Sequence, residues 1–329
     1  MPKVPKKAHQ YNSPVKAIAT GIRDLFRKPD RQLSLPENER LDGKRVLVTG
    51  SSSGLGLATA IELARLGAHV VMAVRSGIPD KGELVKKRSG SGKVDMIHVD
   101  LTDPESIARL VEAVVARYGP LDILICNAAV VTRQSRETRS GLDEMFMVNY
   151  LAKFLLVTRL IELGGLNTGG PDLPRIIVIN SESHRNPAKI EWDTFGMYEP
   201  YGINQAVSMY GYYKLLLLTM VNELSRRLNP AGKVSYMVSA LCPGPVNSNI
   251  AREAPAMLQP LLRLVFRLFF RSPRKACRPV VYLATSRDIE GRDMDYLFLM
   301  QRKEMDEKAT DPEHGRRLWE LTERLASTL

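Results

Sequence analysis

The sequence predicts a doubly wound α/β fold, a single domain with a parallel sheet of about seven strands and helices on both of its faces. Two observations support this prediction. From Asp42 onward, short runs rich in Val, Ile and Leu alternate with longer helical segments, as repeated βα units do. The strand segments are apolar along most of their length, which is typical of parallel strands buried on both faces. In such sheets ligands bind at the carboxyl ends of the strands.

Each strand is predicted from a short apolar run, and each helix from apolar residues that recur at helical spacing. The expected strands span 45–48, 70–74, 94–99, 121–126, 175–179, 234–241 and 296–299. The expected helices span 57–66, 103–118, 142–163 and 208–228. Asp103-Pro104 supports the second helix, because Asp caps a helix and Pro suits its first turn. A last amphipathic helix, 311–325, would pack on the sheet or on a second subunit of a homo-oligomer.

The chain divides into three parts by composition. Residues 1–41 are a basic extension with an amphipathic helix, residues 42–302 the α/β domain, and residues 303–329 a C-terminal helical tail. The net charge is +11, and residues 1–45 hold eleven Lys and Arg against five Asp and Glu. No basic and aromatic groove or DNA-reading motif accompanies this charge, so we expect no nucleic-acid partner.

The three cysteines and the hydropathy of the chain indicate where the protein resides. Cys126, Cys242 and Cys277 lie far apart and show neither metal-ligand nor disulfide spacing. We therefore expect no metal site and a reducing, cytoplasmic environment. The sequence has no uninterrupted apolar run of about 18 residues and no secretory signal, so a spanning helix is not expected.

Two amphipathic segments leave membrane association open. Residues 14–28 place apolar side chains at helical spacing with Lys and Arg between them, so this helix packs on the protein body or lies on a membrane surface. Residues 254–271 are apolar with an Arg at every fourth position from Arg263. This second segment is expected to cover a greasy substrate pocket, to dip into a membrane interface, or to pack wholly on the body.

A glycine-rich turn between the first strand and the first helix is the first candidate site. Glycines adopt the backbone conformations that such a turn needs, and the N-terminus of the following helix presents unpaired N–H groups that favour a pyrophosphate. A glycine-rich turn without a ligand is the alternative. The residues of this turn are Thr49, Gly50, Ser51, Ser52, Ser53, Gly54, Leu55 and Gly56.

Arg75 indicates which dinucleotide would bind. It follows the second strand, 19 residues after Gly56, where dinucleotide folds place an acidic residue for the ribose hydroxyl of NAD or an Arg for the 2′-phosphate of NADP. No acidic residue follows before Asp80. The sequence thus favours NADP(H) over NAD(H); the alternative is that Arg75 is a solvated side chain at a strand end.

Further polar and small residues follow the other strands or lie on the helices between them. Tyr210 and Lys214 are four residues apart on one helix, hence on one face. A neighbouring ammonium would lower the pKa of Tyr210 from about 10 toward the range useful for proton transfer. The remaining candidates are Asp100, Leu101, Asn127, Ala128, Asn149, Ser181, Pro243, Gly244, Val246 and Ser248.

Taken together and in this order, these motifs resemble those of the short-chain dehydrogenase/reductase family over residues 42–302. The resemblance implies a Rossmann domain in which Ser181 orients the substrate oxygen and Tyr210 is the acid/base. It also implies that Lys214 tunes Tyr210 and holds the nicotinamide ribose. Asn149 would support a proton relay. Asp100 would contact the adenine side, and Asn127 would support the end of the fourth strand.

Segments 181–185, 272–291 and 317–325 are similar to retinol dehydrogenase-like enzymes and their WW-domain oxidoreductase and protochlorophyllide reductase relatives. The resemblance implies an NADP(H)-dependent oxidoreductase for a lipophilic carbonyl or alcohol, retinoid-like or sterol-like. The alternative is a non-catalytic cofactor-binding scaffold. Ala129, Tyr213 and Asn180 depart from the usual family residues, and His184 is expected in a loop or pocket wall.

Overall fold

The computed structural model describes residues 33–35, 39–245, 271–292 and 294–329, and within them it confirms the doubly wound α/β fold. The strand order is β3-β2-β1-β4-β5-β6-β7-β8. All pairs are parallel except β7–β8, which is antiparallel. The strands are β1 Arg45–Thr49, β2 His69–Val74, β3 Val94–His98, β4 Ile123–Cys126, β5 Arg175–Ile179, β6 Met237–Cys242, β7 Met294–Phe298 and β8 Gln301–Arg302.

Helices lie at all five places where the sequence predicted them, and α3, α10 and several short helices are additional. The main helices are α2 Gly54–Arg65, α3 Asp80–Ser89, α4 Pro104–Tyr118, α6 Ala152–Glu162, α7 Ile203–Leu228, α10 Arg278–Thr285 and α12 Pro312–Ala326. Shorter ones are α5 Glu144–Phe146, α9 Pro273–Ala276 and α11 Glu307–Thr310, with the 3₁₀ turns η2 Glu182–Arg185 and η3 Pro230–Gly232. The expected helix over 142–163 is interrupted by a π-helical turn, η1 Met147–Leu151.

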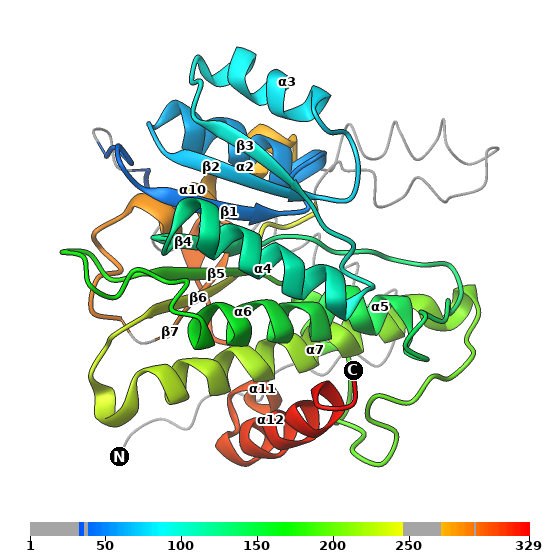
Figure 1. Ribbon diagram of the computed structural model, residues 1–329. Coiled ribbons are helices and arrows are strands. Elements are labelled where there is room, and N and C mark those ends of the chain that lie inside the picture. Colours follow the sequence, from blue (N-terminus) through cyan, green and yellow to red (C-terminus); the bar gives the residue numbers. More distant parts are fainter. Residues whose placement is uncertain (1–32, 36–38, 246–270, 293) are drawn as a thin grey trace.

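Two hydrophobic clusters lie on opposite faces of the sheet. One contains residues of α4, α6, α7 and α12, the helices that Figure 1 shows in front of the strands and below them. The other contains residues of α2, α3 and α10. Strands β1, β2, β4, β5 and β6 supply side chains to both clusters, which explains their continuous apolar sequences.

The order of the strands in the sheet determines where a crevice for a ligand forms. β1 pairs with β2 on one side and with β4 on the other, so the chain reverses direction across the sheet beside β1. At such a switch point the loops after the two neighbouring strands diverge and leave a crevice at their carboxyl ends. The glycine turn follows β1, and Asn127-Ala128 follows β4, so both candidate segments border this crevice.

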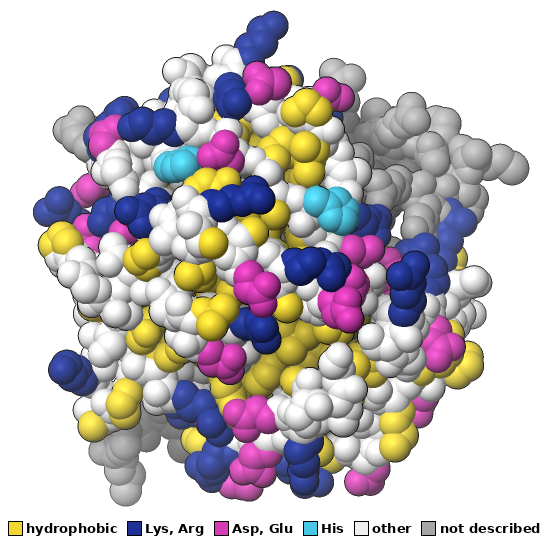
Figure 2. Space-filling view, viewed as in Figure 1, with side chains coloured by type: hydrophobic (Ala, Val, Ile, Leu, Met, Phe, Trp, Pro, Cys, Tyr) yellow, Lys and Arg dark blue, Asp and Glu magenta, His cyan; other side chains and the backbone are white. Residues whose placement is uncertain are grey.

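Several expectations fall outside the described residues: the amphipathic helix 14–28, the apolar segment 254–270, and Val246 and Ser248. None of the described helices is both long and apolar enough to cross a bilayer. Within the same described ranges, no three His, Cys, Asp or Glu side chains gather as metal ligands, and all three cysteines are buried thiols. On the described surface in Figure 2, acidic and basic side chains are intermixed.

Candidate functional site

The glycine turn allows β1 and β4 to approach closely at their carboxyl ends. Gly50 has φ +64°, and a Cβ there would lie 2.7 Å from the Cα of Ala128. A Cβ on Gly56 would lie 2.5 Å from the carbonyl oxygen of Gly50 and still closer to the Asn127 amide. Neither position tolerates a larger residue without movement of backbone. The glycine spacing is thus required by the packing of this turn against β4.

The N-terminus of α2 fits an anionic group. The helix begins at Gly54, three residues before the sequence suggested, and Ser53 at its N-cap forms no capping hydrogen bond through its side chain. The first turn carries no acidic residue. Its backbone N–H groups therefore keep the partial positive charge that a pyrophosphate prefers. The buried Ser51 hydroxyl faces inward and donates to the Val48 carbonyl at 3.0 Å, so Ser51 stabilises the turn itself.

Thr49 and Asn127 join the ends of β1 and β4. The Thr49 hydroxyl accepts from the backbone N–H groups of Asn127, at 3.0 Å, and Ala128, at 3.2 Å. The Asn127 side-chain amide donates to the carbonyls of Thr49, at 2.9 Å, and Gly50, at 3.1 Å. These bonds fix the floor of the crevice. The Asn127 amide nitrogen is thus engaged with the protein backbone.

Arg75 and Asp100 lie at the ends of β2 and β3. Asp100 accepts from the Thr102 N–H at 2.9 Å and from the Thr102 hydroxyl at 2.7 Å. Burial opposes ionisation, but these bonds and the charge of Arg75 keep the pKa of Asp100 below its usual value. Arg75 is exposed, and Leu101 is half-buried beside Asp100. A cation and an anion therefore border the outer end of the crevice.

Ser181 caps the short η2 turn that follows β5. Its hydroxyl accepts from the Ser183 N–H at 3.2 Å and lies 3.1 Å from the Ser183 hydroxyl. His184 is fully buried in the same turn, and its Nδ1 lies 2.7 Å from the Ser181 carbonyl oxygen. The Ser181 backbone carbonyl is therefore held by a hydrogen bond with His184 of the same turn.

Helix α7 brings Tyr210 and Lys214 to this turn. The Tyr210 side chain interacts with that of Ser181, and the Lys214 ammonium lies 5.7 Å from the Tyr210 ring centroid. Lys214 is buried and donates to the Ile179 carbonyl at the end of β5, at 2.9 Å. The close packing depends on Gly211, where a Cβ would lie 2.8 Å from the Ser183 carbonyl oxygen. Gly211 was not predicted as part of the site, although it directly follows Tyr210 in the sequence.

The charge states of this pair differ from the sequence-based expectation. Burial raises the pKa of Tyr210, and the hydrogen bond with Ser181 opposes that rise. Burial, together with repulsion from Lys153, lowers the pKa of Lys214 well below its usual value. Burial therefore outweighs the lowering of the Tyr210 pKa that we expected from Lys214.

Asn149 lies in the middle of the π-helical turn η1. Its side-chain carbonyl accepts from the Val130 N–H, and its amide donates to the Val130 carbonyl, both at 2.8 Å. The side chain thus clamps the segment that follows Asn127-Ala128. π-Helical turns are frequent at functional sites, but the apolar sequence of 142–163 did not reveal this one.

The segment after β6 and the residue before Ser181 complete the described surroundings. Pro243 is buried and Gly244 has φ +75°, so the chain turns sharply after β6. Asn180 is 3% exposed, and neither polar atom of its side chain has a hydrogen-bond partner. A buried amide without partners is costly, so this position beside Ser181 is suited to a polar group of a ligand or to water.

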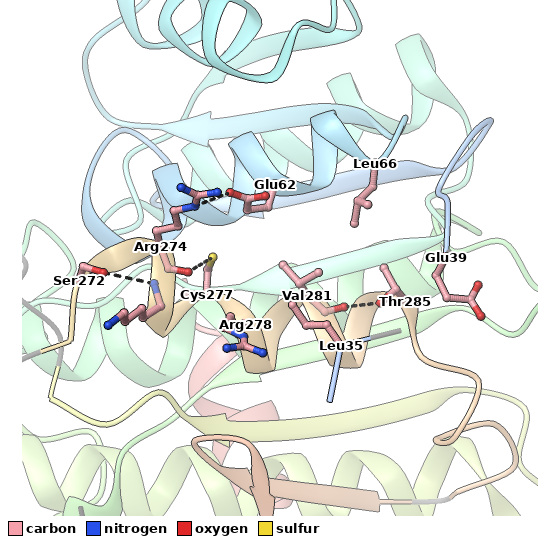
Figure 3. Close-up of a pocket in the computed structure, with 11 residues that line it drawn as sticks. Leu35, Glu39, Glu62, Leu66, Ser272, Arg274, Cys277, Arg278, Val281 and Thr285 are labelled. Atoms are coloured by element: carbon pink, nitrogen blue, oxygen red, sulfur yellow. Dashed lines mark hydrogen bonds and ion pairs between the residues drawn. The ribbon is translucent and has the colours of Figure 1, made fainter. Parts of the chain in front are cut away.

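A separate hollow of about 480 Å³ lies on the other face of the sheet, between α2 and α9–α10 (Figure 3). Arg274 points toward Glu62 across it, and apolar side chains such as Leu66 and Val281 form part of its wall. None of the candidate residues lines it. The candidate residues therefore lie apart from this hollow, at the carboxyl ends of the strands.

Comparisons with known proteins agree with this geometry. A family model described as short chain dehydrogenase matches residues 44–191. The chain is 32% identical over 306 residues to retinol dehydrogenase 14 of Homo sapiens, with 88% of each protein covered. It is 30% identical over 331 residues to the WW domain-containing oxidoreductase of Danio rerio, covering 97% of this chain and 78% of that protein. A crystal structure of a putative uncharacterized protein from Mycobacterium paratuberculosis matches with a TM-score of 0.69 and 26% identity, covering 90% of this chain and 98% of that one.

Proposed function

This chain belongs to the short-chain dehydrogenase/reductase family, in its retinol dehydrogenase-like subgroup, and from this membership we propose an NADP(H)-dependent oxidoreductase. Its substrate is a lipophilic carbonyl or alcohol, retinoid-like or sterol-like. The observation that carries the proposal is the placement of Tyr210 beside Ser181 and Lys214, at the carboxyl edge of the sheet.

In the proposed reaction, each polar group of the site has one task. The Ser181 hydroxyl holds the substrate oxygen, and Tyr210 donates a proton to that oxygen during reduction or removes it during oxidation. Lys214 stabilises the phenolate of Tyr210 and holds the nicotinamide ribose. Asn149 acts through the backbone it clamps, since both polar ends of its side chain are engaged with Val130. A bound nicotinamide supplies or accepts the hydride.

The other candidate residues would hold the dinucleotide. The N–H groups at the start of α2 bind the pyrophosphate, Asp100 and Leu101 border the adenine, and Arg75 pairs with a 2′-phosphate. Thr49, Asn127 and Ala128 shape the crevice by joining β1 to β4. We assign Pro243, Gly244, Val246 and Ser248 to the nicotinamide side, on the resemblance to the family alone.

Exposed apolar side chains near Tyr210 support a lipophilic substrate. Ile203 and Val207 lie on one face of α7, two turns and one turn before Tyr210, and they are 61% and 51% exposed. Met197, in the preceding loop, is 63% exposed. Apolar surface at this end of α7 suits the approach of a long apolar molecule. Retinol dehydrogenase 14, a relative by sequence, carries such a substrate in its name.

Cofactor choice is tested by titrating the protein with NADPH and with NADH while cofactor fluorescence is followed. Arg75→Ala removes a charge-assisted bond to the 2′-phosphate. The variant should therefore bind NADPH more weakly by about tenfold or more, and bind NADH as the wild type does. Arg139→Ala, at an exposed arginine in the loop between β4 and α5, is the matched control. Equal loss for both cofactors would exclude a role for Arg75 in this choice.

Turnover is tested with NADPH and two substrates in separate assays. One is retinaldehyde, and the other is a small polar ketone. We expect turnover of retinaldehyde, and Tyr210→Phe lowers kcat by about 10²- to 10⁴-fold without abolishing NADPH binding. Tyr212→Phe removes a hydroxyl from the same helix and should retain most of the activity, since Tyr212 contacts Glu191 instead. Tight NADPH binding without turnover of any carbonyl would favour the scaffold alternative. Turnover of the small ketone alone would exclude a lipophilic substrate.

We also propose that the protein is cytoplasmic with peripheral membrane contact through the basic amphipathic stretch 14–28. Cosedimentation with anionic vesicles tests this, comparing the full chain with a chain that lacks residues 1–28. Equal sedimentation of the two would contradict it.

A further inference from the structure

Lys153 is a buried lysine for which the proposed reaction has no task. It is the second residue of α6 and is 2% exposed. Its ammonium donates to the carbonyl oxygens of Ala128 and Val148, both at 2.8 Å. Among the described residues it forms no ion pair with a carboxylate. Burying an ammonium whose charge is compensated only by carbonyl oxygens costs free energy, so we expect Lys153 to have a role at this site.

The two carbonyls belong to two different parts of the site, the segment after β4 and the π-helical turn η1. Ala128 follows Asn127 at the end of β4 and packs against Gly50 of the glycine turn. Val148 belongs to the π-helical turn and directly precedes Asn149. Lys153 and Asn149 therefore tie the segment after β4 to the same turn, through Ala128 and Val130.

The charge of Lys153 also acts on Lys214. Lys214 binds the carbonyl at the end of β5, and β5 is the direct neighbour of β4. The groups that face these two ammoniums are the thiols of Cys126 on β4 and Cys242 on β6. Burial raises the pKa of both thiols to about 11, so they are neutral near pH 7. Burial lowers the pKa of Lys153 to about 8, and Lys153 in turn disfavours a charge on Lys214.

We propose that Lys153 is a positioning residue that fixes the Ala128 carbonyl beside the glycine turn and places a second positive charge near Lys214. This inference rests on the proposed function. A positive charge nearby lowers the pKa of the Lys214 ammonium. Removing it raises the pKa of Lys214 and loosens the segment 127–130 that borders the dinucleotide.

The test is the dependence of kcat on pH for Lys153→Met and Lys153→His, with NADPH and retinaldehyde. The His ring, with a usual pKa of about 6.5, is largely neutral between about pH 7 and pH 8, where Lys153 is still charged, but it keeps an N–H donor. Both variants should shift the limb due to Lys214 upward by about one pH unit. Lys153→Arg keeps the charge and should leave that limb in place. Lys189→Met, an exposed lysine paired with Glu191, is the control for loss of one charge.

A lower kcat without a shifted limb in the two neutral variants would show a merely structural role and overturn the proposal. NADPH titration gives a second readout that does not need turnover. Lys153→Met should weaken NADPH binding by about fivefold to tenfold, and unchanged affinity in a folded variant would also contradict the proposal. A wild type that neither binds NADPH nor turns over a carbonyl would instead refute the proposed function. Should Lys153→Met not fold, Lys153→His carries both measurements.

Discussion

At the scale of single residues, His184 has one defined protonation state. The Asp306 N–H donates to Nε2 at 3.4 Å, so Nε2 carries a lone pair. Nδ1 must then carry the proton and donate to the Ser181 carbonyl oxygen. Burial, with the charge of Arg185, lowers the pKa of His184 to about 4. The neutral imidazole thus joins the serine turn to the C-terminal segment.

His184 should therefore make stability depend on pH in the mildly acidic range. The pKa is lower in the folded chain than in the unfolded one, so the unfolded state binds the proton first as pH falls from about 6.5 to about 4. Between pH 7 and about pH 5 the wild type should lose about 2 kcal/mol of unfolding free energy through this group. Urea unfolding at both pH values measures it.

His184→Asn is the comparison variant, because its amide can still donate to the Ser181 carbonyl but does not titrate. Its loss between the two pH values should be smaller than that of the wild type by this amount. The same loss in both proteins would mean that other groups, such as carboxylates, cause the acid sensitivity.

At the scale of secondary structure, the contact between α7 and η2 sets the geometry of the proposed catalytic pair. Gly211→Ala places a methyl group 2.8 Å from the Ser183 carbonyl oxygen, which belongs to backbone and cannot rotate away. The helix must move, and displacements of about 1 Å can cost about 10²-fold in rate. We expect kcat to fall by about 10- to 100-fold in the retinaldehyde assay, with NADPH binding retained.

Gly92→Ala is the control for this prediction, because a Cβ there meets nothing within 4 Å. It should keep wild-type activity. Full activity of Gly211→Ala would show that α7 and η2 tolerate separation, and that the Ser181–Tyr210 contact is not sensitive to this packing.

Some helices and strands could be predicted from the sequence and others could not, for physical reasons. The strand over 175–179 was predicted with its observed bounds, because five buried residues lie between Pro174 and Asn180. Helix α3 was not predicted, since Gly82 and Val85 are its only buried residues and it shows no apolar stripe. The π-helical turn was missed because an apolar run does not reveal which carbonyl each N–H will meet.

The site shows the same division between local and long-range information. Tyr210 and Lys214 could be recognised because their spacing on one helix is a local property. Lys153 could not, since a lysine on an apolar helix is expected at the surface, and its burial depends on the carbonyl of Ala128, 25 residues away. The closeness of Arg75 to Asp100 likewise follows from the pairing of β2 with β3.

At the scale of the whole molecule, the C-terminal helix α12 is part of the main hydrophobic cluster. Leu318 and Trp319 are buried in it, against α6 and α7. The Trp319 ring lies 4.9 Å from the Phe154 ring between centroids, and the Arg227 guanidinium lies 4.6 Å above Trp319. The helix predicted over 311–325 thus packs on the helices that cover the sheet, rather than on the sheet itself (Figure 1).

The burial of Trp319 makes the stability of the domain depend on α12. Trp319→Ala should lower the unfolding free energy by about 3–5 kcal/mol, through lost apolar burial and the cavity left against Phe154. Trp192→Ala removes a half-buried ring that Arg317 covers, so it should cost less. Urea unfolding measures both. Because Trp319 meets α7 at Arg227, more than four turns beyond Tyr210, the folded Trp319→Ala variant should bind NADPH as the wild type does. A loss of stability below about 1 kcal/mol would mean that α12 packs on the domain without supporting it.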